Sequence, residues 1–326
     1  MNYRIITSML SILLLAAACR SDKSSNNKTS SPDRAPQSVT IPAFNRDSAY
    51  AFVQAQVDFG PRNMGSEAHK ACKDWIVAKL KSYDLQVAEQ NFPAAIYTNE
   101  VFPGTNIIGK INPDHPRRIV LAAHWDTRFM AEKDAKAEDR DKPILGADDG
   151  ASGVGVLLEI ARTIKDHPID MGIDLVFFDA EDQGDNGGEK ETWCLGSQFW
   201  AANLSAQNRP QYGILLDMVG AKGATFPKEA ISLNFANGVL EKVWSLGQSM
   251  GYGGYFSNER VNQLVDDHLF VNQVGLPMID IINYKNGFGH YHHTQSDNME
   301  IIDRNTLRAV GQVVLAVLYK ESVGAI

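Results

Sequence analysis

Along this 326-residue chain, short runs of mostly apolar residues alternate with segments in which apolar residues recur at helical spacing. This alternation limits the folds that the chain can adopt. The runs over 118–123, 173–178, 212–218 and 277–282 are typical of strands buried on both faces of a sheet. Apolar residues at helical spacing over 150–164 predict a helix between the first two of these strands. The chain is therefore predicted to form a single α/β domain with a central mixed, mostly parallel β-sheet sandwiched by α-helices.

Further elements fit the same architecture. The sequence predicts a helix over 66–80, strands over 86–92 and 105–111, and a closing helix over about 305–320. No internal repeat and no second change of composition divides the region, so one domain over 42–326 is expected. In such a sheet, the active site is expected beyond the carboxyl ends of the strands.

The first 41 residues have a different character. Residues 5–18 form an apolar run of signal-peptide length, and three alanines precede Cys19. This pattern resembles a bacterial lipoprotein signal, so we expect a signal peptide over 1–18 and a lipid anchor on Cys19; an ordinary secretory leader cut near the same alanines is the alternative. Residues 19–41 are polar and are expected to form a flexible linker. Either leader predicts export, to the periplasm or to a bacterial membrane surface.

Charge and cysteine content exclude several classes of protein. The chain carries 31 Lys and Arg against 39 Asp and Glu, a net charge of −8, so general binding to nucleic acid is not expected. A membrane contact is expected only through the lipid anchor. Three cysteines cannot form a disulfide scaffold. Cys72 and Cys194 are candidates for a disulfide bond if their Cα atoms come within about 7 Å of each other. The sequence does not predict an oligomeric state.

Histidine and acidic residues follow the predicted strands. Because the carboxyl ends of parallel strands meet at one edge of a sheet, these scattered side chains are expected to converge there. One Zn²⁺ ion bound by nitrogen and oxygen ligands, with an open position for substrate, explains them together. Singly, each has an ordinary alternative: Asp148 or Asp149 as a helix cap, Glu181 and Asp182 as exposed loop residues, and the histidines at 290–293 as a surface cluster. The residues in question are His124, Asp126, Asp149, Glu181, Asp182, Asp217 and His293.

At this point several short motifs, in order along the domain, resemble the zinc aminopeptidase-like fold and, within it, the glutaminyl-peptide cyclotransferases, or glutaminyl cyclases. Their order and their coverage of nearly the whole folded chain carry the resemblance. The motifs are Phe59-Gly60-Pro61-Arg62, residues 122–127, Gly146-Ala147-Asp148-Asp149, residues 177–182, Leu195-Gly196-Ser197, residues 215–221, Asp266-Asp267-His268 and His293-Thr294.

The resemblance implies a role for each matching residue. Asp149, Asp182 and His293 would be ligands of a catalytic zinc, and Glu181 would be the general acid and base. Asp217 and Asp266 match carboxylates that form a hydrogen-bonded network with that glutamate in cyclases. Trp193 matches an indole that lines the substrate pocket, and His292, beside the metal ligand, is expected near the substrate as well.

The implied activity is the conversion of an N-terminal glutamine of a peptide or protein to pyroglutamate, with release of ammonia. Two alternatives remain open at this point. Related aminopeptidases bind two zinc ions, and His124 and Asp217 are present here to complete a second site, which would allow hydrolysis of N-terminal residues. A surface lipoprotein that keeps the fold only to bind a partner is the other alternative, although such proteins normally lose ligands.

Overall fold

The computed structural model describes residues 38–207, 209–285 and 287–326. The expected signal peptide, Cys19 and residues 20–37 of the expected linker lie outside this part, so the leader and the tether stay predictions. Within the described residues, none of the helices combines the length and the apolar character needed to cross a membrane.

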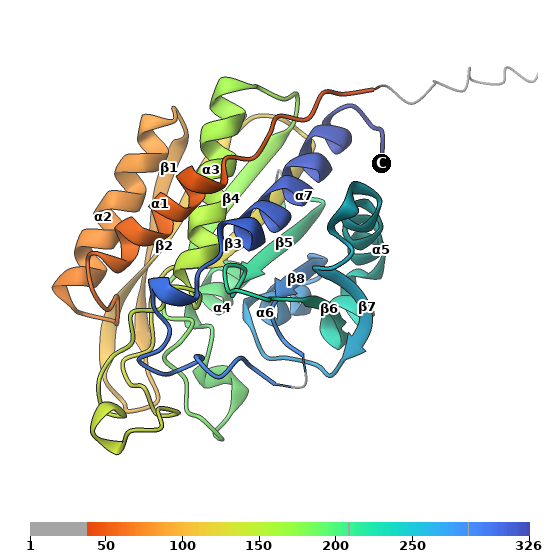
Figure 1. Ribbon diagram of the computed structural model, residues 1–326. Helices are drawn as coiled ribbons and strands as arrows, with labels where there is room; N and C mark the ends of the chain where they lie inside the picture. Colours follow the sequence, from red (N-terminus) through yellow and green to blue (C-terminus); the bar gives the residue numbers. More distant parts are fainter. Residues whose placement is uncertain (1–37, 208, 286) are drawn as a thin grey trace, which may run out of the picture. The chain divides into compact units, whose positions relative to one another are not determined.

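A six-stranded mixed sheet forms the centre of the domain (Figure 1). The strands lie in the order β1-β2-β4-β3-β5-β8, in which β4, β3, β5 and β8 are parallel, while β1 and β2 extend one edge through antiparallel pairings. This arrangement confirms the predicted fold class. The bounds are β1 Gln86–Ala95, β2 Val101–Ile111, β3 Arg118–His124, β4 Gly172–Phe178, β5 Tyr212–Asp217 and β8 Met278–Ile282.

The parallel strands are buried at every position, as expected of continuous apolar runs. Successive side chains of a strand point to opposite faces of the sheet, and β3 supplies a layer to each. Leu121 packs with the larger cluster of core residues, whereas Val120 and Ala122 pack with a smaller cluster on the other face. The sheet is therefore covered on both sides.

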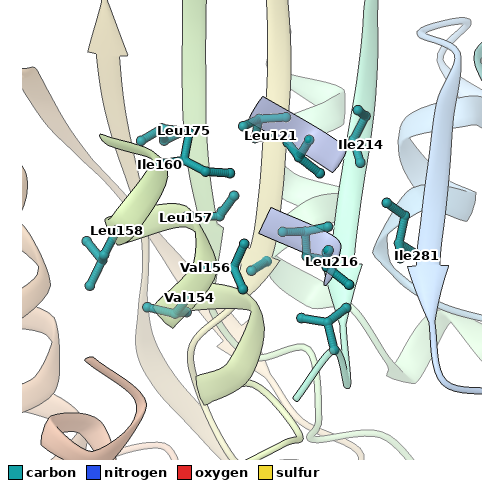
Figure 2. Packing of buried hydrophobic residues seen from close by; sticks show 14 of the residues in the cluster. Leu121, Val154, Val156, Leu157, Leu158, Ile160, Leu175, Ile214, Leu216 and Ile281 are labelled. Atoms are coloured by element: carbon teal, nitrogen blue, oxygen red, sulfur yellow. The ribbon is translucent and has the colours of Figure 1, made fainter. Parts of the chain in front are cut away.

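More helices cover one face of the central sheet than the other. The larger cluster includes buried residues of α1, α2, α3, α5 and α7, and the smaller one includes residues of α4 and α6. Figure 2 shows part of the larger cluster, with Leu157 of α3 packed near Leu121 and Leu216 of the sheet. The bounds are α1 Arg46–Val57, α2 Glu67–Ser82, α3 Ala151–Asp166, α4 Leu195–Ala202, α5 Ala230–Gly247, α6 Asp267–Gln273 and α7 Arg304–Ser322.

Some elements lie outside the sequence-based expectations. The helices α1, α4, α5 and α6 are additional, as is a small parallel sheet of β6 (Phe226–Glu229) and β7 (Phe256–Val261). Cys72 and Cys194 are both buried and free, so the possible disulfide between them is absent.

The carboxyl ends of the parallel strands collect polar side chains at one edge of the sheet. His124 is the last residue of β3, Asp217 is the last residue of β5, and Asp179 directly follows β4. Strand β3 pairs with both β4 and β5, so these three ends lie side by side. The fold thus gathers the residues that the sequence analysis singled out.

Candidate metal centre and active site

One cavity of about 210 Å³ opens at this edge of the sheet. Eight residues to which the sequence analysis gives a place at the metal or the substrate line this cavity, although they come from six separate segments of the chain. They are Asp149, Glu181, Asp182, Trp193, Asp217, Asp266, His292 and His293. The structure therefore brings these eight residues together, while the role of each residue stays a prediction. His124 and Asp126 do not line the cavity but contact Asp149 and the backbone of Glu181, which do.

His293 faces two carboxylates across the cavity floor. Its Nε2 lies 2.9 Å from Oδ1 of Asp182 and 3.8 Å from Oδ2 of Asp149. Burial opposes a positive charge on the imidazole, but the Asp182 carboxylate outweighs it and raises the pKa of His293 to about 9. For Asp149, burial is likewise outweighed, and the hydrogen bond from His124 lowers the pKa of the carboxyl below its usual range.

The distances from His293 to each carboxylate fit a zinc ion, although the ligand atoms that lie within 4.8 Å of one another here belong to Asp149, His292 and His293 and do not include Asp182. Imidazole nitrogen and carboxylate oxygen are zinc ligands, and ligand atoms of a tetrahedral site lie roughly 3.4 Å apart, between the two distances measured at His293. Oδ2 of Asp182 is buried and finds no hydrogen-bond partner in the described part of the chain, which is costly unless a cation or water satisfies it. The chemistry and the unsatisfied oxygen both favour a divalent cation here.

A second group of potential ligands adjoins the first. His124 Nε2 lies 3.1 Å from Oδ1 of Asp149 and 3.1 Å from Oδ1 of Asp217. These three residues offer ligand atoms within 4.8 Å of one another, as do Asp149, His292 and His293. Asp149 belongs to both groups. The geometry of the side chains therefore does not by itself distinguish one metal ion from two.

Glu181 lies beside the candidate metal ligands. Burial raises the pKa of its carboxyl well above the usual range, and the charges of Asp182 and Asp266 act in the same direction. Oε1 accepts a hydrogen bond of 3.3 Å from the Cys194 thiol, and the backbone N–H donates to Asp126. A carboxyl with a raised pKa can both accept and return a proton near neutral pH, as a general acid and base must.

Asp217 and Asp266 complete the acidic wall of the cavity. Burial raises the pKa of Asp217 to about 8, against the opposing hydrogen bond with His124. Asp266 caps the N-terminus of α6: its Oδ1 accepts a hydrogen bond of 2.5 Å from the Asp267 N–H. Its Oδ2 is buried and has no hydrogen-bond partner among the described residues.

The helix-cap alternative for Asp148 and Asp149 is not observed. Gly150 occupies the N-cap position of α3, and no side chain caps that helix end. Asp148 instead accepts hydrogen bonds from the Gly220 N–H at 2.6 Å and the Tyr291 hydroxyl at 2.7 Å. Asp149 is thereby left free to face the histidines.

Aromatic rings form the opposite wall. The rings of Trp193 and His293 are stacked with centroids 6.1 Å apart, and the Arg128 guanidinium lies 4.7 Å from the Trp193 centroid on the indole face. Gly184 allows this packing, because a Cβ there would lie 2.1 Å from Cδ2 of the indole. His292 stacks on His293 with centroids 3.7 Å apart. Trp193 and His292 are thus fixed at the cavity surface.

The backbone is strained at four places around the cavity. Left-handed φ values near +50° at residues other than glycine, asparagine or aspartate are uncommon and cost free energy. Among the described residues, all four such positions are site residues or lie next to one in the sequence or in space. They are Ala180 (φ 56°), Cys194 (φ 57°), Met218 (φ 45°) and His293 (φ 56°).

Glu132 and Arg128 are functional candidates that the sequence analysis missed. Oε1 of Glu132 lies 2.9 Å from Nδ1 of His293, the nitrogen that faces away from the candidate metal site. Arg128 holds the same carboxylate through its Nη2 at 3.2 Å. A carboxylate that accepts the second N–H of a metal-bound histidine fixes its tautomer and orientation. The charged run Glu132-Lys133-Asp134 is typical of a solvated loop. The sequence therefore does not indicate that Glu132 accepts a hydrogen bond from His293.

Replacing Glu132 by alanine is expected to lower zinc affinity by roughly 10- to 100-fold, because His293 loses the acceptor that orients its ring. Competition with a chelator of known affinity measures the change. Glu138→Ala, at an exposed glutamate of the same loop, is the matched control and should keep wild-type affinity. Equal zinc affinity in both variants would show that Glu132 does not orient the ligand.

The model of peptidase family M28 matches residues 106–318 of this chain. Among solved structures, a Porphyromonas gingivalis glutaminyl cyclase is 48% identical with a TM-score of 0.83, over 85% of this chain and 99% of that one. A leucine aminopeptidase precursor from Bacteroides thetaiotaomicron is 44% identical with a TM-score of 0.84, over 86% and 99%.

Among curated proteins, the bovine glutaminyl-peptide cyclotransferase is 27% identical over 249 residues, which cover 64% of this chain and 64% of that enzyme. The match thus spans somewhat less than two thirds of the curated relative. The resemblance to the zinc aminopeptidase-like fold and to glutaminyl cyclases is confirmed. With more than half of its residues matched by the family model, the chain belongs to peptidase family M28.

Proposed function

We propose that this chain is a zinc-dependent glutaminyl-peptide cyclotransferase, acting on peptides or proteins with an N-terminal glutamine. The observation that carries the proposal is the joint lining of one cavity by Glu181, Asp217, Asp266 and Trp193 beside the candidate zinc ligands. Similarity to a bacterial glutaminyl cyclase over 99% of its length supports the same activity.

Asp149, Asp182 and His293 would hold the zinc ion, which when bound supplies Lewis-acid polarisation of a carbonyl oxygen. Glu181 takes a proton from the α-amine of the substrate, whose nitrogen then bonds to the γ-carboxamide carbon and closes a five-membered ring. The bond from that carbon to the amide nitrogen breaks, and Glu181 returns the proton to the departing ammonia. No water molecule is consumed.

Asp217 and Asp266 would orient the substrate for ring closure. Both carboxylates line the cavity, and a carboxylate there can accept a hydrogen bond from a substrate N–H group. Because nucleophile and electrophile belong to one molecule, holding the α-amine in the right orientation to the γ-carboxamide carbon supplies much of the catalysis. Trp193 offers an apolar face against which the glutamine side chain packs.

A two-zinc aminopeptidase is the second candidate, and the convergence of His124, Asp149 and Asp217 favours it. In that activity Glu181 would deprotonate a water molecule for peptide hydrolysis. A leucine aminopeptidase precursor among the similar structures points the same way.

One experiment separates these activities and the non-catalytic alternative. The zinc-to-protein ratio is measured on purified protein, together with turnover of Gln-2-naphthylamide and Leu-p-nitroanilide. One zinc with ammonia release from the glutamine substrate is the expected result. Two zinc ions with leucine release would establish the aminopeptidase instead, and zinc-loaded protein without either turnover would favour a binding protein.

A further inference from the structure

Lys133 is the single lysine or arginine among the described residues that line the cavity. It lies at the rim, where its side chain is exposed together with Asn186, Val265 and Phe288. The carboxylates at the other end of the cavity are almost completely buried. A peptide whose first residue occupies the closed end must therefore leave the cavity past this rim.

The ammonium of Lys133 is held in place by neutral groups. Its Nζ lies 2.7 Å from Nδ1 of His292 and 5.1 Å from the centre of the Phe288 ring. The ring of Phe288 stacks on His292 with centroids 3.8 Å apart, so the three side chains form one assembly. An ammonium can only donate, so Nδ1 of His292 accepts and its ring proton lies on Nε2.

The Lys133 ammonium has N–H donors that its contacts within the described chain do not use. An ammonium carries three N–H donors, and the contact with His292 uses one of them. Within the described part of the chain, no carboxylate oxygen comes within 4.0 Å of its Nζ. Two donors and the full positive charge are thus available to a molecule in the cavity.

The neighbouring acidic residues are already engaged. Glu132, the adjacent residue, is paired with Arg128 and His293. Asp149 and Asp182, the other acidic residues whose charges act on Lys133, are the candidate zinc ligands, and a divalent cation would balance both. In the metal-loaded protein, the charge of Lys133 is therefore uncompensated at the rim.

We propose that Lys133 forms an anion subsite for a carboxylate carried by the residue that follows the N-terminal glutamine. This inference rests on the proposed cyclotransferase activity and adds a substrate class to it: peptides whose second residue is acidic. A dipeptide offers the same group as its free C-terminal carboxylate, so the test must distinguish an acidic side chain from a chain end.

The test compares kcat/KM of the zinc-loaded wild-type protein on Gln-Glu-Ala-amide and Gln-Gln-Ala-amide, which differ in charge but hardly in shape. A preference of roughly two- to fivefold for the acidic peptide is expected of an ion pair at a partly exposed site. The preference should shrink as salt is raised, because salt screens exposed charges. Gln-Ala against Gln-Ala-amide reports the effect of a C-terminal carboxylate separately.

Variants connect the preference to Lys133. In Lys133→Met the ratio of the two rate constants is expected to fall to about one, and in Lys133→Arg it should be retained. Lys133→Glu is expected to reverse the selection, so that Gln-Lys-Ala-amide becomes the better substrate. Chelator competition on each variant shows whether the zinc site is intact, which separates loss of selectivity from loss of the metal.

Two patterns would overturn the subsite: equal kcat/KM on acidic and neutral peptides in the wild type, or an acidic preference that persists in both Lys133→Met and Lys133→Glu. A preference confined to Gln-Ala over Gln-Ala-amide would overturn the acidic side chain as the substrate feature. If zinc-loaded wild-type protein cyclises none of these peptides, the proposed function itself fails, a result distinct from turnover without selectivity.

Discussion

The Glu181→Gln variant is expected to lose roughly 10²- to 10⁴-fold in kcat, the usual contribution of a positioned general acid and base, while its zinc affinity stays at the wild-type value. Glutamine keeps the size of the side chain but cannot carry the proton from the amine to the departing ammonia. The replacement changes none of the predicted ligands Asp149, Asp182 and His293, so the zinc site should survive it.

Ammonia release and chelator competition, measured on the same preparation, check this result. Glu189→Gln is the matched control, since it makes the same chemical change at an exposed glutamate in the loop that follows Glu181. That variant should cyclise at the wild-type rate. If Glu181→Gln instead lost zinc together with activity, Glu181 would be a metal ligand and the assignment of Asp182 would have to be reconsidered.

The elements predicted best from the sequence are the buried parallel strands, because a single signal, the burial of apolar side chains, dominates there. Strands β3, β4, β5 and β8 are buried on both faces, so each reads as a short apolar run, and the structure places each within a residue or two of its expected bounds. Because parallel strands end at one edge of the sheet, the convergence of Glu181 and Asp217, which lie at or just after the ends of β4 and β5, also followed from the order of elements.

The parts that escaped prediction depend on contacts between distant segments. Glu132 and His293 meet at a distance of 2.9 Å although 161 residues separate them, and neither lies in a periodic element. Helix α5 is interrupted by a non-helical backbone at Ala236, and strand β7 is largely exposed, so both lack a clean hydrophobic period. Local sequence patterns do not predict contacts between distant residues when those residues lie outside regular helices and strands.

Removal of His293 tests the centre of the site most directly. His293→Ala is expected to lower zinc affinity by at least about 10³-fold, more than the loss of a residue that only orients a ligand, because the single nitrogen that faces both Asp149 and Asp182 disappears. The two carboxylates would remain, but without the imidazole they repel each other in a buried setting.

Thermal unfolding with and without zinc gives a second measure that does not depend on turnover. Zinc that binds only the folded protein raises Tm of the wild type, and the rise should largely vanish in His293→Ala at the same zinc concentration. His290→Ala is the matched control, because His290 is exposed, lies three residues away and does not line the cavity. Equal zinc-induced shifts in both variants would mean that residues 149, 182 and 293 do not share an ion.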